Sequence, residues 1–123
     1  MRPRYILNHM VQYRRTDRVN RVAAAISDPT RRAILERLAQ GPARISDVAQ
    51  PFAMSLTGFC KHVRVLERAR LVRRTRRGRE NTLELSCEPL RQVAQWVLQY
   101  EPFWNARADR LQQFLVNQKE KPQ

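Results

Sequence analysis

The chain has 123 residues, and its 24 Lys and Arg against 11 Asp and Glu give a formal net charge of +13. This length fits one domain with one hydrophobic core. The charge favours an anionic partner, nucleic acid ahead of a membrane surface. No apolar run approaches the roughly 20 residues that span a bilayer, and no secretory signal core is evident, so we expect a cytoplasmic protein without membrane contact.

The residues that carry chemistry do not form the patterns of an enzyme or a metal site. The chain has few acids, no glycine-rich phosphate loop and no Ser/His/Asp arrangement. His9 and His62 are the only histidines, and Cys60 and Cys87 lie in different predicted elements without metal-ligand spacing. We therefore expect no catalytic residue, no metal and no cofactor.

Residues 1–15 contain Pro3 and scattered arginines without a sustained period. We interpret them as an N-terminal arm, either disordered or a non-native extension, and assign the domain to residues 16–118. An arm whose arginines touch DNA is the alternative.

A helical pattern begins at Thr16, where Thr16 or Asp17 serves as the N-cap. Ser27-Asp28-Pro29 ends this helix and begins another, because Asp28 is a good N-cap and Pro29 suits the first helical position. The first helix has an apolar face at helical spacing, formed by Val19, Val22, Ala23 and Ile26.

The second helix is expected to bury Ile34, Leu35 and Leu38 and to end at Gly41-Pro42. Arg31 in its first turn opposes the helix dipole, which is a mild local cost. That cost is explained if the arginine binds a phosphate or a buried acid, and simple solvation explains it equally well.

Residues 45–49 predict a short third helix that Pro51 ends, and Phe52 and Met54 are expected to supply apolar contacts in the following turn. Residues 55–68 predict a longer helix with Ser55 as its N-cap. A short helix, a tight turn and a longer basic-faced helix form a helix-turn-helix. The buried stripe expected on the longer helix consists of Leu56, Phe59, Val63 and Leu66.

Away from that stripe, the longer helix presents small and polar residues with no acid before Glu67. Small residues let the backbone approach a DNA groove, and Lys or His side chains reach phosphates or base edges. A solvated basic face is the alternative, and the neighbouring elements favour the major groove. The candidate DNA-reading residues are Ser55, Thr57, Gly58, Lys61, His62 and Arg64.

A β-hairpin follows, in which Leu71-Val72 leads into an arginine-rich run, Gly78 marks the turn and residues 82–85 alternate as a half-buried strand. This hairpin is the wing, so the expected fold class is mainly α with a small β-hairpin, a dimeric winged helix-turn-helix. Beside such a motif we favour DNA contact over a solvated face for the arginines. The candidate wing and backbone contacts are Arg31, Arg74, Arg76, Arg77 and Arg79.

Glu88-Pro89 begins another helix, and Glu101-Pro102 either kinks it or begins a second segment. Four aromatic residues lie on adjacent turns at this junction. Core packing is one interpretation, but the pattern is too apolar for so small a domain, and we favour a homodimer interface made with residues 16–26. The expected interface residues are Val19, Val22, Ile26, Trp96, Tyr100, Phe103, Trp104 and Leu111.

The segment 27–85 resembles the ArsR/SmtB family of bacterial winged-helix repressors. The resemblance is carried by residues 27–35, residues 55–67, Leu71-Val72 and Gly78-Arg79, and the helices over 90–115 are similar to a branch of that family. It implies a homodimeric repressor that binds double-stranded DNA at a palindromic operator, with the helix from Ser55 in the major groove. The cysteine pair and the C-terminal ligands of the family's metal sensors are missing, so metal sensing does not carry over.

Two positions depart from the family pattern. Cys60 stands where the family usually has Ser, and a thiol weakens a phosphate hydrogen bond. Arg70 stands where Gly is common at the end of the DNA-reading helix. Arginine in a left-handed cap costs roughly 1 kcal/mol, so either the turn differs or the strain is tolerated.

A non-specific architectural DNA- or RNA-binding protein fits the charge equally well and is the competing function. A repressor prefers its own operator by about 10³-fold or more, whereas an architectural protein does not. The sequence identifies no small-molecule inducer.

Overall fold

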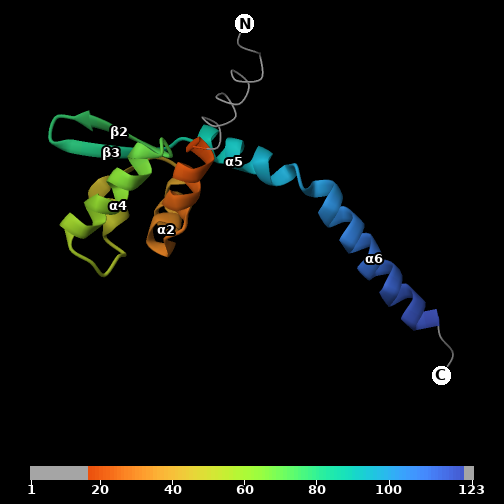
Figure 1. Cartoon of the computed structure of the whole chain (residues 1–123). Helices are drawn as coiled ribbons and strands as arrows, with labels where there is room; N and C mark the ends of the chain where they lie inside the picture. The colour runs from red at the N-terminus through yellow and green to blue at the C-terminus, as the bar shows by residue number, and fades with distance from the viewer. Residues whose placement is uncertain (1–16, 121–123) are drawn as a thin grey trace, which may run out of the picture. The chain divides into compact units, whose positions relative to one another are not determined.

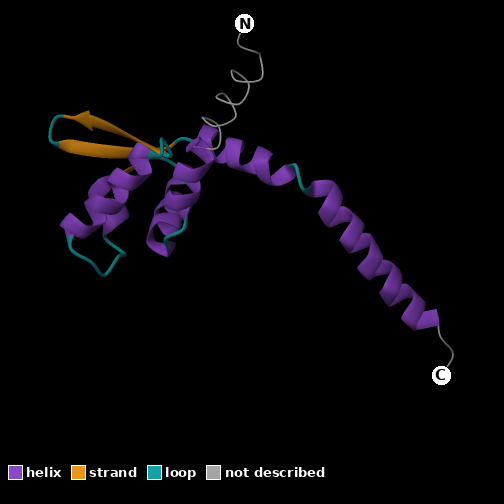
Figure 2. Ribbon diagram, viewed as in Figure 1, coloured by secondary structure: helices purple, strands orange, loops and turns teal. Residues whose placement is uncertain are grey.

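The computed structural model describes residues 17–120 (Figures 1 and 2). The arm expected at residues 1–15, and Thr16, lie outside the described residues. The chain divides after Val93 into two compact units. The elements are a helix over 17–26, α2 (Pro29–Leu38), β1 (Ala43–Arg44), α3 (Ile45–Ala49), α4 (Leu56–Arg68), β2 (Val72–Arg77), β3 (Glu80–Leu85), α5 (Glu88–Leu98) and α6 (Glu101–Glu120).

The first unit packs helices against a small antiparallel sheet, and α2 and α4 lie side by side next to it (Figure 1). The sheet has the order β1-β3-β2, so β3 is central and its Leu83 is fully buried. The fold is the mainly helical winged helix-turn-helix that the sequence predicts. The core comprises Val22, Ala25, Ile34, Leu35, Leu38, Val48, Phe59, Val63, Leu66, Ala69, Leu71, Val72 and Leu83.

One strand was not expected. Ala43 and Arg44 pair with Leu83 and Thr82, which extends the predicted hairpin to three strands. A two-residue strand shows no period in the sequence, and only its partner across the sheet defines it.

The helix over 17–26 ends where predicted, before Ser27-Asp28-Pro29, and its predicted N-cap at Thr16 lies outside the described residues. One residue of its predicted apolar face is wrong. Ala25 is fully buried, whereas Ala23 is exposed. Val22 and Ala25 lie three residues apart on one side of the helix, and Ala23 lies one residue, or about 100°, around from Val22.

Asp28 and Ser55 are the N-caps that the sequence predicts. The Asp28 carboxylate accepts the Arg31 backbone N–H at 3.0 Å, and the Ser55 hydroxyl accepts the Gly58 N–H at 3.1 Å. Pro29 begins α2, as predicted. These local bonds satisfy donors that the first turn of a helix leaves free, so each helix begins where its cap stands.

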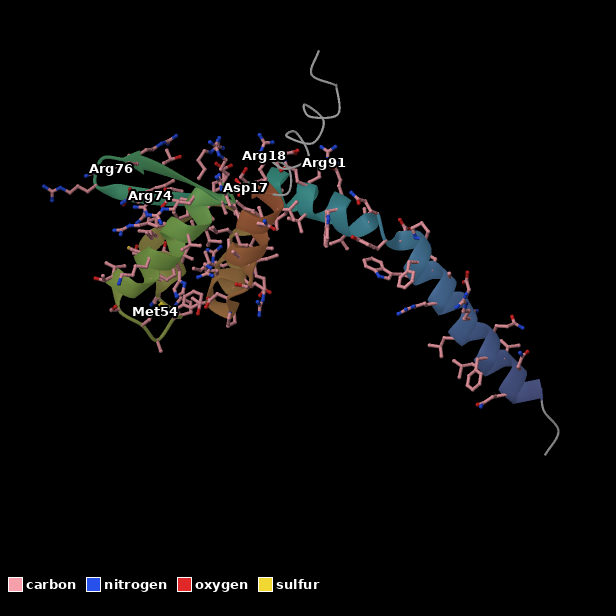
Figure 3. All side chains as sticks on the ribbon, in the orientation of Figure 1. Asp17, Arg18, Met54, Arg74, Arg76 and Arg91 are labelled. Atoms are coloured by element: carbon pink, nitrogen blue, oxygen red, sulfur yellow. The ribbon has the colours of Figure 1, made fainter. Side chains whose placement is uncertain are left out.

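The turn before α4 is only partly as predicted. Phe52 packs on Phe59 with 5.5 Å between ring centroids, but Met54, on the loop before α4 (Figure 3), is 38% exposed and Leu56 is 62% exposed. The expected burial of Leu56 is wrong, and Met54 lies outside the buried core. Leu56 is the first residue of α4, and the helix enters the core one turn later, at Phe59.

The end of α4 is a Schellman motif. The Leu71 N–H donates to the Leu66 carbonyl and the Arg70 N–H to the Glu67 carbonyl, each at 3.0 Å. Arg70 has a φ of +61°, so the left-handed turn is present and its strain is tolerated. Buried Leu66 and Leu71 supply the apolar contact that accompanies this motif.

We expect Arg70→Gly to raise the free energy of unfolding by about 1 kcal/mol, because glycine adopts positive φ without a steric cost. Arg68→Gly, in the last helical turn with ordinary helical geometry, is the control and is expected to lower it by about 0.5–1 kcal/mol. Urea denaturation measures both changes. Equal destabilisation by the two substitutions would show that Arg70 is not strained.

In the second unit, α6 begins at Glu101 after a turn at residues 99–100, so Glu101-Pro102 begins a second segment and does not kink one helix. Trp96 and Tyr100 pack edge to face at 5.3 Å, and the Arg107 guanidinium lies 4.2 Å from the centroid of the Phe103 ring. The large apolar side chains of this part of the chain are exposed. They are Trp96, Leu98, Tyr100, Phe103, Trp104, Leu111, Phe114, Leu115 and Val116.

Candidate nucleic-acid interface

The outward face of α4 carries the residues that the sequence proposes for DNA reading. Thr57, Lys61 and Arg64 are exposed, while Phe59, Val63 and Leu66 on the opposite face are buried. This separation follows from the 3.6-residue period of the helix. The arrangement anchors one side of α4 in the core and leaves a basic side free for a ligand.

Ser55 and Gly58 have structural roles at the start of α4. The Ser55 hydroxyl is engaged as the cap, and a Cβ on Gly58 would lie 3.3 Å from the Ser55 Oγ. Glycine at this position keeps the cap uncrowded. Ser55 is exposed, whereas Gly58 is half-buried.

His62 belongs to a cluster that connects α4 to the junction between the first two helices. Its Nδ1 lies 3.2 Å from the Arg31 Nη1 and 3.8 Å from the Asp28 Oδ2. A guanidinium only donates hydrogen bonds, so Nδ1 is the acceptor and the proton of the neutral ring lies on Nε2. His62 is half-buried, and the Nδ1 side of its ring faces Arg31 and Asp28.

Arg31 serves the end of the preceding helix. Its Nε donates to the Ala25 carbonyl at 2.6 Å and its Nη2 to the Ala24 carbonyl at 3.1 Å. Arg32 donates in the same way to the Ile26 carbonyl at 2.9 Å. A cation at a helix C-terminus binds free carbonyls and the negative end of the dipole, which offsets its unfavourable place at the start of α2. All three guanidinium nitrogens of Arg31 have a partner, so this bridging role accounts for the arginine without DNA, and its phosphate contact stays a prediction.

The Asp28 carboxyl has a lowered pKa. The backbone N–H of Arg31 is the largest cause of the lowered pKa. The charge of His62 in its protonated form, the charge of Arg31 and the N–H of Thr30 act in the same direction. Partial loss of hydration opposes them. Because the folded pKa lies below the unfolded one, the stabilisation from Asp28 is present above about pH 4 and is lost as the pH falls through the folded pKa.

We therefore expect Asp28→Asn to make the thermal stability of the protein less dependent on pH. Asparagine caps helices well but does not titrate. The wild-type protein should unfold at a higher temperature near neutral pH, and the difference between the two proteins should shrink below about pH 4. Thermal melts across this range test the prediction, which a pH-independent difference would contradict.

The wing arginines fall into two groups. Arg74 is half-buried and pairs with Glu67 at 2.8 Å, which joins β2 to the last turn of α4. Arg76, Arg77 and Arg79 surround the tip, where all three are exposed, and the Arg76 Nε donates to the Gly78 carbonyl at 3.2 Å. Figure 3 labels Arg74 and Arg76 on the hairpin. Arg74 is therefore committed to the fold, and the three tip arginines are free to meet a phosphate backbone.

The residues expected at a dimer interface differ in accessibility. Val22 is only 2% exposed because it packs in the core of its own chain, so it is removed from the interface. Val19 and Ile26 are half-buried. The remaining five are at least 45% exposed: Trp96, Tyr100, Phe103, Trp104 and Leu111.

Between residues 17 and 120 no three His, Cys, Asp or Glu side chains gather as a group that could hold a metal ion. In the same part of the chain, no helix combines the length and the apolar content needed to cross a bilayer.

Together, α3, the turn to α4, α4 itself and the β2–β3 hairpin define a winged helix-turn-helix domain. A family model described as "Helix-turn-helix domain" matches residues 26–75. The chain is 33% identical over 82 residues to the transcriptional repressor SdpR of Bacillus subtilis (strain 168), a match that covers 67% of this chain and 91% of SdpR.

Solved structures agree with this class. An ArsR family transcriptional regulator matches with a TM-score of 0.69 at 38% identity, over 73% of this chain and 93% of that chain. A homodimeric winged helix-turn-helix DNA-binding domain from Mycobacterium bovis matches with a TM-score of 0.56 at 25% identity, over 77% and 85% of the two chains. The chain belongs to the ArsR family and is a DNA-binding transcriptional regulator. Its relatives are transcriptional regulators, a non-enzymatic class.

Proposed function

We propose that this protein represses transcription in the bacterial cytoplasm as a homodimer bound to a palindromic DNA operator, and that residues 16–118 carry both DNA binding and dimerisation. The observation that carries the proposal is the exposed, acid-free face of α4, with Thr57, Lys61 and Arg64 on the outside. The N-terminal half of such a helix reads base edges in the major groove.

Lys61 and Arg64 have the lengths and charges to reach guanine acceptors or phosphates, and the Thr57 hydroxyl donates or accepts. His62 contributes one donor, the Nε2–H that its contact with Arg31 leaves free. Met54 and Leu56 are exposed and join this surface. Exposed apolar side chains at the start of a reading helix suit contact with thymine methyl groups.

The wing supplies charge. Arg76, Arg77 and Arg79 meet the backbone or the minor groove beside the site that α4 occupies. Arg31 and Arg74 act indirectly, because Arg31 holds His62 from the α2 side and Arg74 ties β2 to α4 through Glu67.

The exposed aromatic and aliphatic side chains of α5 and α6 form the dimer contact. Water-exposed Trp, Phe and Leu side chains in such number mark a protein–protein surface. A two-fold dimer presents two α4 helices, which matches an operator with two inverted half-sites.

Selection of binding sites from genomic fragments tests the proposed function. At about 150–200 mM salt, where purely electrostatic binding is suppressed, we expect recovery of a few fragments that share an inverted repeat. The recovered site should bind about 10³-fold more tightly than random DNA. Uniform recovery of fragments would show that the protein is not a sequence-specific repressor.

A further inference from the structure

A cavity of about 800 Å³ lies in the first unit, between the helix over 17–26, the end of α4, the start of β2 and the start of α5. Small-molecule sites usually measure about 300–1,000 Å³. Its wall holds two glutamates, Glu67 and Glu88, against six arginines, of which Figure 3 labels Arg18 and Arg74. The six are Arg18, Arg21, Arg68, Arg70, Arg73 and Arg74.

Acids neutralise only half of these arginines. Arg21 pairs with Asp17 at 3.1 Å, Arg73 with Glu84 at 2.9 Å and Arg74 with Glu67 at 2.8 Å. Within residues 17–118, the other three, Arg18, Arg68 and Arg70, form no ion pair with an acid. Like charges held around one cavity repel each other, and an anion bound among them relieves that repulsion.

Two further features of the wall are unfavourable without a ligand. Arg70 keeps its positive φ of 61° although glycine closes the same turn without strain. Arg74 has a buried Nε without a hydrogen-bond partner in the described structure, whereas buried donors are ordinarily satisfied. Strain and unsatisfied donors of this kind concentrate at binding sites.

We propose that this cavity binds a small organic molecule with two or more carboxylate or phosphate groups. Guanidinium forks bind both groups through paired hydrogen bonds, and several arginines around one cavity require an anion with more than one charged group. The site lies at the C-terminal end of the DNA-reading helix. Arg68, on the cavity wall, is one turn beyond Arg64 and eleven residues, or roughly 16 Å along the helix axis, beyond Thr57.

Occupancy of the cavity connects to DNA binding through its walls. The last turn of α4 and the first residues of β2 both line the cavity. A bound anion therefore contacts the C-terminal end of the DNA-reading helix and the first strand of the wing. An effect of the anion on operator affinity rests on the proposed function, whereas the binding site itself does not.

Calorimetric titration of the full chain tests the site, with sodium pyrophosphate and sodium citrate as probes and acetate as the singly charged control at equal ionic strength. We expect one equivalent of pyrophosphate or citrate to bind with a Kd below about 1 mM, and acetate not to bind. The two probes distinguish a phosphate from a carboxylate ligand.

Arg70→Gly should weaken binding of the probe by about tenfold or more, because it removes one guanidinium. The substitution also relieves backbone strain, so a lost signal does not reflect unfolding, and thermal melts check this directly. Arg110→Gln is the matched control, since it removes one exposed positive charge from α6, outside the cavity. It should leave the affinity within about twofold.

Three results would overturn the proposal. The first is that neither probe binds more tightly than acetate. The second is that Arg110→Gln weakens binding of the probe as much as Arg70→Gly does, which would show diffuse charge attraction. The third is that Arg70→Gly lowers the affinity for random DNA as strongly as the affinity for the probe, which would make the cavity wall a DNA contact. None of them alters the outcome of the genomic-fragment selection, so failure of this site and failure of the proposed function are distinguishable.

Discussion

The double substitution Trp104→Glu and Leu111→Glu is expected to yield monomers whose operator affinity is lower by about 10²–10⁴-fold. Trp104 is 47% and Leu111 60% exposed in a single chain, and both lie on a helix rich in exposed apolar side chains. Four introduced carboxylates in the apolar contact of a dimer carry a large desolvation cost. Binding at two half-sites is lost when the subunits separate, and the affinity falls by the corresponding avidity factor.

Sedimentation measures the oligomeric state, and titration of the selected operator measures affinity. Gln112→Glu is the matched control, because it places the same charge beside Leu111 on an exposed polar position of α6. It should remain dimeric. If the unmodified protein already sediments as a monomer at micromolar concentration, the homodimer proposal is wrong.

The second large effect concerns DNA reading by α4. Lys61→Ala is expected to cost about 1–3 kcal/mol on the operator and much less on random DNA, because a contact to a base edge carries sequence information. The Lys61 side chain is exposed and makes no hydrogen bond or ion pair within the described structure, so its removal leaves the domain intact. His62→Ala should show the same preference, although it also removes the acceptor that faces Arg31.

Arg77→Ala is the contrasting variant at the tip of the wing. It should weaken operator and random DNA alike and lower the slope of log affinity against log salt by about one unit. If Arg77→Ala instead lowers the affinity for some DNA sequences more than for others, the wing arginine reads a narrow, A·T-rich minor groove. If Lys61→Ala lowers the affinity for operator and for random DNA equally, α4 does not read the DNA sequence, and non-specific binding is favoured.

Local chemistry determined most of the elements. Asp28, Pro29 and Ser55 set the starts of α2 and α4 because a cap acts on amides within its own turn. Gly78 marks the hairpin turn, with a φ of +62°. The ArsR-type order of motifs was visible for the same reason, since each motif is a short run of residues whose spacing requires no knowledge of distant contacts.

Burial at the ends of elements depended on the tertiary structure. Leu56 and Met54 have the apolar character of core residues, but both precede the turn at which α4 meets α2 and the sheet. Val22 has the spacing of an interface residue and packs in the core of its own chain. Periodicity identifies a face of a helix, and only packing decides which part of that face is covered and by which chain.

The sequence also could not distinguish the arginines from one another. Arg31 donates to carbonyls six and seven residues before it, and Arg74 pairs with Glu67 across two elements, while Arg77 and Arg79 stay exposed. Composition determined that the protein carries a large positive charge, which favours an anionic partner. The tertiary structure decided which guanidinium groups are free, because hydrogen bonds and ion pairs act over only 3–4 Å or so and depend on the distance between folded elements.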